Sequence, residues 1–158
     1  MKIEKTNVMR LLDTQKITYN VYTYPHQEQA VDGEMVASLI GKRPTQVFKT
    51  LVARAKNQIY VFMIPVCDSL DLKKAAIAAN EKSLEMVGVS ELLPLTGYIR
   101  GGCSPIGMRY KYSTFIEQKA EALDTIIFSA GKIGYQVELS LEDLGKILPI
   151  KITNLTVN

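Results

Sequence analysis

Residues 97–108 constrain this chain more than any other stretch, because four of these twelve residues are glycine and one is proline. Glycine loses much conformational freedom on folding and proline lacks a backbone N–H, so neither a helix nor a strand core is expected to run through them. We expect a shaped loop. Two interpretations stay open: the glycines turn backbone N–H groups towards a carbonyl, carboxylate or phosphate oxygen, or they form an ordinary tight turn.

Bulk composition is typical of a folded protein of one domain. Of the 158 residues, 47% are hydrophobic and 22% are charged, which suits a chain with its own core. We therefore expect residues 1–158 to form a single domain. The net charge of +3 argues against binding along a long nucleic-acid duplex but allows a short contact between a basic patch and a nucleic acid.

The sequence predicts neither a membrane span nor a secreted protein. It has no apolar run of about 18 residues, and its first residues are too polar for a signal peptide. Cys67 and Cys103 lack the paired spacing of a disulfide framework or a zinc site. We expect a cytoplasmic protein with two reduced thiols.

Periodicity and breaking residues predict a mixture of helices and strands. Helices are expected at residues 6–15, 33–40, 70–79, 90–94 and 140–148, with Pro94 limiting the fourth and Asp68 or Ser69 capping the third. Strands are expected at residues 19–24, 47–55, 59–66, 83–87, 109–116, 125–129, 135–139 and 150–155. These elements do not alternate regularly, so we predict an α/β domain of the mixed α+β kind: one mixed, largely antiparallel sheet surrounded by helices.

Several familiar catalytic arrangements are absent from the sequence. His26 is the only histidine, which argues against a zinc site built from several histidines and against Ser-His-Asp catalysis. His26 itself follows Pro25 and is interpreted as a loop residue. Residues 102–107 match the start of a P-loop, but Met108 and Arg109 stand where lysine and serine or threonine are required. No metal and no cofactor is predicted.

Lys49, Cys103 and one further corner remain as candidates for chemistry. Lys49 lies inside an apolar strand, where its ammonium either reaches solvent or faces an anionic group. Cys103 lies in the glycine-rich loop, but the chain offers no histidine partner to take its proton, which disfavours it as a nucleophile. Ser129-Ala130-Gly131 forms a second corner of small residues, which either lines the same pocket or is a simple turn.

Three motifs together make the chain resemble the YbaK-type aminoacyl-tRNA deacylases, free-standing relatives of the editing domain of bacterial prolyl-tRNA synthetases. They are Phe48-Lys49-Thr50-Leu51, then Thr96-Gly97-Tyr98 followed by the glycine-rich residues 101–107, and finally Ser129-Ala130-Gly131-Lys132 with Gly134. Their order and spacing match the family across nearly the whole chain.

The resemblance implies a compact domain whose mixed sheet shapes a small cavity, and hydrolysis of mischarged tRNA, typically Cys-tRNA(Pro), without a metal. It assigns the catalytic role to Lys49. It implies that the substrate is bound by Tyr24, Phe48, Gly101, Gly102, Cys103, Ser104, Pro105, Ser129, Gly131 and Gln136. In the family the substrate's own thiol is thought to attack its ester, and prolyl-tRNA synthetase is an implied partner.

Two departures from the family leave the amino-acid preference open. Some relatives carry aspartate at the position of Gln136, and the position of Cys103 varies among them. Two alternatives therefore accompany the Cys-tRNA(Pro) hypothesis. One is a deacylase for alanine or serine on tRNA, and the other is a module that binds an aminoacylated tRNA end or a synthetase without cleaving anything.

Overall fold

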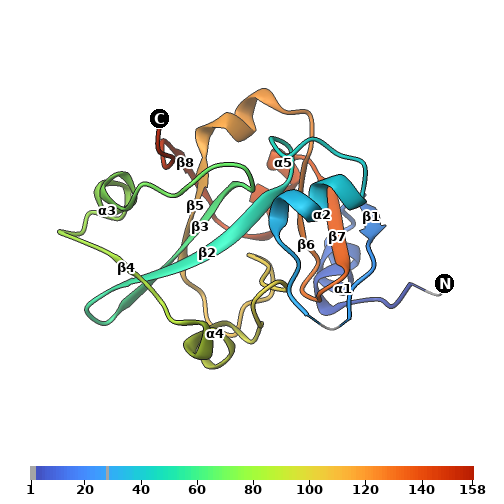
Figure 1. Ribbon diagram of the computed structural model, residues 1–158, viewed down its shortest axis with the longest axis horizontal. Coiled ribbons are helices and arrows are strands. Elements are labelled where there is room, and N and C mark those ends of the chain that lie inside the picture. Colours follow the sequence, from blue (N-terminus) through green and yellow to red (C-terminus); the bar gives the residue numbers. More distant parts are fainter. Residues whose placement is uncertain (1–2, 28) are drawn as a thin grey trace.

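The strands form two sheets in the computed structural model, which describes residues 3–27 and 29–158 (Figure 1). The three-stranded sheet is antiparallel, in the order β1 (Asn20–Thr23), β7 (Tyr135–Leu139) and β6 (Ile126–Ser129). The five-stranded sheet has the order β4 (Glu85–Met86), β2 (Phe48–Ala55), β3 (Gln58–Pro65), β5 (Ser113–Glu117) and β8 (Lys151–Thr153). Its β3–β5 and β5–β8 pairs are parallel and the others antiparallel, so the predicted mixed, largely antiparallel pairing is confirmed. The expectation of one sheet is wrong, because the strands divide into two.

The two sheets touch where β6 passes the start of β2. Val47 and Ile127 form a parallel bridge there, and the Ile127 N–H donates to the carbonyl of Gln46 at 3.0 Å. Both residues are almost completely buried. The sheets are therefore joined just before Lys49 on one strand and just before Ser129 on the other.

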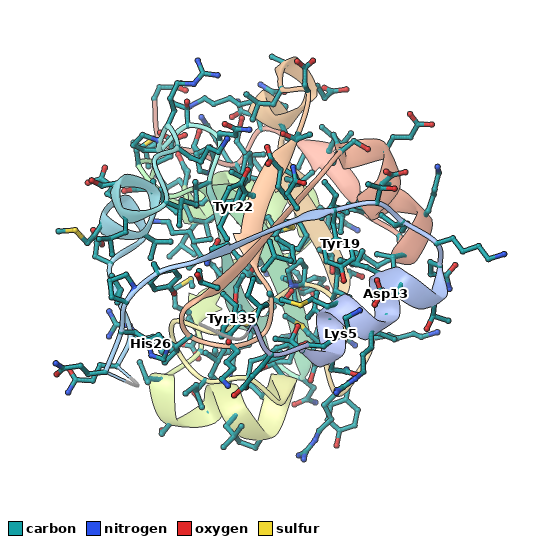
Figure 2. The ribbon with its side chains drawn as sticks, turned by 90° about the vertical axis from the view of Figure 1, so that its right-hand side faces the viewer. Lys5, Asp13, Tyr19, Tyr22, His26 and Tyr135 are labelled. Atoms are coloured by element: carbon teal, nitrogen blue, oxygen red, sulfur yellow. The ribbon has the colours of Figure 1, made fainter. Side chains whose placement is uncertain are left out.

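Helices cover both sheets (Figure 1). Serine, threonine and aspartate caps begin three of them: Thr6 accepts from the Met9 N–H, Asp71 from the Lys73 N–H and Ser140 from the Asp143 N–H. At the end of the first helix the Tyr19 hydroxyl donates to Asp13 at 3.0 Å. Figure 2 labels both residues. The helices are α1 (Asn7–Thr14), α2 (Gly33–Leu39), α3 (Leu72–Ala79), α4 (Val89–Thr96) and α5 (Leu141–Ile147), with a 3₁₀ turn at Gln118–Ala122.

Two apolar clusters hold these layers together. Val8 and Leu12 of α1 are fully buried in the cluster that contains Phe128 of β6. On the other sheet, Ala75 and Ala76 of α3 lie in the cluster of Phe62 and Phe115, whose rings stack at 5.3 Å. The small alanines allow this helix to pack closely on the sheet.

Several boundaries differ from the sequence predictions: the strands expected at residues 83–87 and 150–155 are shorter, at Glu85–Met86 and Lys151–Thr153. Three other differences have a clear physical reason. Helix α4 continues past Pro94 to Thr96, because a proline removes only its own donor and the Gly97 N–H still reaches the Leu93 carbonyl at 2.8 Å. Helix α3 begins at Leu72 rather than at residue 70, because Leu70 pairs with Thr156 in a bridge and Asp71 is the cap. Residues 109–112 are not in a strand: the Arg109 N–H donates to the Thr96 carbonyl instead of joining a ladder.

A buried carboxylate, Glu138 of β7, ties the three-stranded sheet to the segment before β2. It accepts hydrogen bonds from Tyr22 at 2.5 Å, from Thr125 at 2.5 Å and from Gln46 at 3.1 Å, and Asn20 also donates to it. Burial alone would raise the pKa of Glu138, but these donors and nearby Lys42 outweigh it and lower the pKa below its ordinary value of 4.5.

Replacing Glu138 with glutamine is expected to lower the free energy of unfolding by about 2 kcal/mol, since bonds to a charged acceptor are lost or reversed. A carboxylate whose pKa is depressed in the folded state contributes its full stability above pH 4.5 and loses it as the pH falls through the folded-state pKa. Urea denaturation should therefore show a large gap between wild type and Glu138→Gln at pH 7 that narrows below pH 4.5.

Exposed Glu121 provides the control, because Glu121→Gln makes the same chemical change at the surface. It is expected to alter stability by less than about 0.5 kcal/mol. A gap of equal size for both variants at every pH would contradict the role given to Glu138.

Candidate active site

A cleft of about 710 Å³ opens beside the junction of the two sheets. Its walls come from β2, from the segment that leads into α2, from α4 and from the glycine-rich segment, with single residues of β6 and β7 contributing. Cavities of about 300–1,000 Å³ hold drug-sized ligands, so this cleft has room for an aminoacyl group. Seven of the predicted site residues line it: Tyr24, Phe48, Lys49, Gly101, Cys103, Ser129 and Gln136.

Lys49 is a half-buried cation in the wall of this cleft. Strand alternation separates it from Phe48, which is 2% exposed. Among the described residues, no carboxylate forms an ion pair with the Lys49 ammonium. The other charged residues in the lining are Arg100 and Asp32, so the cleft has a net positive lining that suits an anionic or electron-rich ligand.

Gly101 also lines the cleft, in a conformation that requires glycine. Its φ is +87°, and a Cβ atom at this position would lie 2.9 Å from the Cα of Ala30. Among the described residues, no acceptor is paired with the Gly101 N–H, whereas the Gly102 N–H donates to the Ile99 carbonyl at 3.0 Å. The glycine-rich segment thus brings unsubstituted backbone to the edge of the cleft, as a cradle requires.

Two buried polar atoms in the lining have no hydrogen-bond partner among the described residues: Oε1 of Gln136 and Oγ1 of Thr50. Gln136 is 6% exposed and pairs across the sheet with Ser129. Leaving a buried acceptor unpaired costs about 1–3 kcal/mol, and a donor on a ligand would remove that cost. Sequence reasoning missed Thr50 as a site residue, although a polar residue beside Lys49 in an apolar strand was the available signal.

Cys103 lines the cleft as a protonated thiol. Burial raises the pKa of Cys103 to about 12, and a hydrogen bond with Thr96 offsets only part of this. Burial also raises the pKa of neighbouring Tyr98 to about 12. A thiol with so high a pKa carries almost no thiolate near neutral pH, which disfavours Cys103 as a nucleophile.

Four of the predicted substrate-binding residues do not line the cleft. Gly102 packs against the turn between β6 and β7, where a Cβ atom would meet the nitrogen of Ile133 at 3.2 Å. Ser104 is fully buried and accepts from the Ile106 N–H. Pro105 lines a different cavity. Gly131 donates its N–H to Ser129 Oγ at 3.1 Å, so it positions a lining residue instead of forming the lining.

Other candidates for chemistry lie outside this cleft. His26 lies in the loop after β1, where Figure 2 labels it, and its ring meets the edge of Tyr24 at 6.4 Å between centroids. Within residues 3–27 and 29–158, no group of three His, Cys, Asp or Glu side chains is placed to hold a metal ion. None of the helices described in this range combines the length and apolar character needed to cross a bilayer.

Comparison with known proteins shows the family of the chain. Residues 27–147 match the model of the aminoacyl-tRNA editing domain. The chain is 42% identical over 140 residues to an Enterococcus faecalis protein named "Putative Cys-tRNA(Pro)/Cys-tRNA(Cys) deacylase EbsC", covering 88% of this chain and 85% of that one.

Two solved structures share the fold at low identity. One is described as a "putative trans-editing enzyme for prolyl tRNA synthetase", with a TM-score of 0.84, 20% identity, and coverage of 96% of this chain and 95% of the other. The second, hypothetical protein APE2540, gives a TM-score of 0.85 at 18% identity, covering 98% of this chain and 100% of the other. They confirm the predicted fold.

Proposed function

The chain belongs to the aminoacyl-tRNA editing domain family, and on that basis we propose that it is a trans-editing deacylase that removes cysteine from mischarged Cys-tRNA(Pro). Cys-tRNA(Cys) is a second substrate of the same chemistry, since the Enterococcus relative carries both in its name. One observation supports a site for this reaction: Lys49, Gly101 and the unpaired Gln136 Oε1 line a single cleft.

The size of the cleft suits the aminoacyl group together with the adenosine that carries it. In this proposal the α-ammonium of the substrate donates to Gln136 Oε1, and the N–H of Gly101 donates to the oxygen of the reacting carbonyl, which gains negative charge. Lys49 positions the terminal ribose-phosphate and screens that charge. Phe48, Tyr24 and Cys103 shape the wall.

Cleavage uses the thiol of the substrate itself. The sulfur attacks the ester carbonyl, a carbon–sulfur bond forms, and the carbon–oxygen bond to the ribose breaks. The thiol proton goes to the ribose oxygen, which leaves as the free tRNA hydroxyl, and the cyclic thioester is then hydrolysed by water. The cleft contributes mainly orientation and N–H donors, which accelerate the attack without a side-chain nucleophile.

This chemistry also explains selectivity in a roomy cleft. Discrimination by fit alone is worth only about 1–3 kcal/mol per methylene, whereas a required thiol rejects alanine chemically. Incubating the protein with tRNA(Pro) charged with radiolabelled cysteine, alanine or serine tests this. Only cysteine should be released. Faster release of alanine or serine would favour the alternative deacylase, and binding without release of any amino acid would favour the non-catalytic module.

Two further properties follow from this function as proposals. Such an enzyme acts in the cytoplasm, where charged tRNA is used. It works beside prolyl-tRNA synthetase, the enzyme whose editing domain the sequence resembles. Pull-down of the synthetase with the purified protein, in the presence and absence of tRNA(Pro), tests the second property.

A further inference from the structure

A second cavity, of about 600 Å³, is lined in part by residues 105–108 of the glycine-rich segment. It is bounded by the end of α1, by residues 105–114 and by the link from α5 to β8. Cys103 lines the first cleft and Pro105 lines this cavity, and two residues of chain span at most about 7 Å. The segment that joins α4 to β5, yellow in Figure 1, therefore contributes to the linings of two neighbouring cavities.

The charged residues that line this second cavity are all basic. Its lining contains Lys111 and Lys151 and no acidic residue. Within the described part of the chain, neither lysine forms an ion pair, and both are exposed. Residues 92–116, which supply much of the wall, contain three cations and no aspartate or glutamate. Such a lining attracts an anion.

Two tyrosines, Tyr110 and Tyr112, line the same cavity as these lysines. Tyr110 is 57% exposed, and its ring lies 6.2 Å from that of Tyr112. The Tyr112 hydroxyl is held by the Leu95 carbonyl at 2.6 Å, so this ring is fixed while Tyr110 stays accessible. Lys151 lies over the Phe115 ring at 5.9 Å and has no described carboxylate partner. An exposed ring and un-neutralised cations in one lining are the combination that binds single-stranded nucleic acid, where the base stacks and the phosphate pairs with lysine.

We propose that this second cavity binds an unpaired nucleotide of the tRNA acceptor end, with its base on Tyr110 and its phosphate between Lys111 and Lys151. This proposal rests on the proposed function, because a tRNA held there presents its terminal adenosine to the neighbouring cleft. Arg100, exposed in the lining of that cleft, continues the basic path along the same segment.

Two substrates distinguish tRNA binding in the second cavity from ester cleavage in the first cleft. Cys-tRNA(Pro) extends into both hollows, whereas cysteinyl-adenosine fills only the first cleft. Tyr110→Ala is expected to raise KM for the tRNA roughly 5- to 100-fold, as loss of one stacked base does, and Tyr110→Phe should retain wild-type KM. Lys111→Ala and Lys151→Ala should each lower the slope of tRNA affinity against salt by about one. Cleavage of cysteinyl-adenosine should stay unchanged in all of them.

Exposed Lys73 on α3 is the matched control, and Lys73→Ala should leave the salt slope unchanged. Unchanged tRNA affinity in the three cavity variants would overturn the proposal, and so would an equal loss on both substrates, which would indicate a structural role. Affinity for uncharged tRNA, measured by fluorescence anisotropy, tests the cavity even if the wild type cleaves neither substrate. A failure of the proposed function is thereby distinguished from a failure of this inference.

Discussion

Replacing Lys49 with alanine is expected to reduce the rate of cysteine release from Cys-tRNA(Pro) by at least about a hundredfold, which is the usual loss when one stabilising charge or donor is removed from a reacting centre. The Lys49 ammonium lines the cleft and has no ion pair among the described residues. Its removal therefore leaves no described carboxylate without an ion-pair partner. Thermal unfolding of the variant should match the wild type within a few degrees.

Lys49→Met is the companion variant, because it keeps most of the apolar stem and removes only the charge. Both variants should lose activity to a similar degree if the charge matters. Retention of full activity by Lys49→Ala would refute the catalytic role of this residue. Recovery of activity in Lys49→Met alone would assign it a packing role.

Replacing Gly101 with alanine is expected to lower the deacylation rate by about a hundredfold, the size of effect produced by a displacement of about 1 Å at a reacting centre. The new Cβ would meet backbone and side-chain atoms of Ala30 at 2.9 Å, so the segment must move away from its position at the cleft. The positive φ of +87° adds backbone strain of about 1–2 kcal/mol.

Gly41→Ala is the control that distinguishes the effect of a clashing Cβ atom from the effect of backbone strain at a positive φ. Gly41 has a similar φ of +71°, but a Cβ there would meet nothing within 4 Å. We expect both variants to lose a similar part of their stability through strain, while only Gly101→Ala loses activity. Steady-state kinetics and urea denaturation on the same preparations would show this. Equal activity in the two variants would contradict the proposed role of the Gly101 N–H as a donor to the reacting carbonyl oxygen.

Local sequence signals predicted most elements of the fold because caps, breakers and periodicity act over a few residues. Thr6 and Ser140, the first residues of two expected helical ranges, accept the capping N–H groups there. The predictions were wrong where a contact between residues far apart in the sequence sets the end of a helix or strand. Because Leu70 forms a bridge with Thr156, α3 begins two residues later than expected. The hydrogen bond from the Arg109 N–H to the Thr96 carbonyl keeps residues 109–112 out of β5.

The same limit applies to the candidate site. The resemblance named Lys49 and Gly101, and both line the cleft. It did not distinguish residues that face the cleft from residues that support it, such as Gly131, because that depends on how the corner after β6 packs. Thr50 was missed: its place beside Lys49 in an apolar strand was a weak signal, and its unpaired buried hydroxyl is visible only in three dimensions. The roles of all these residues stay predictions.

The most direct test is a crystal structure with a cysteinyl-adenosine analogue in which an amide replaces the ester, so that it binds without being cleaved. The account predicts the cysteinyl group in the cleft lined by Lys49 and Gly101, with its α-ammonium about 3 Å from Oε1 of Gln136. Density for the cysteinyl group anywhere else on the molecule would contradict it.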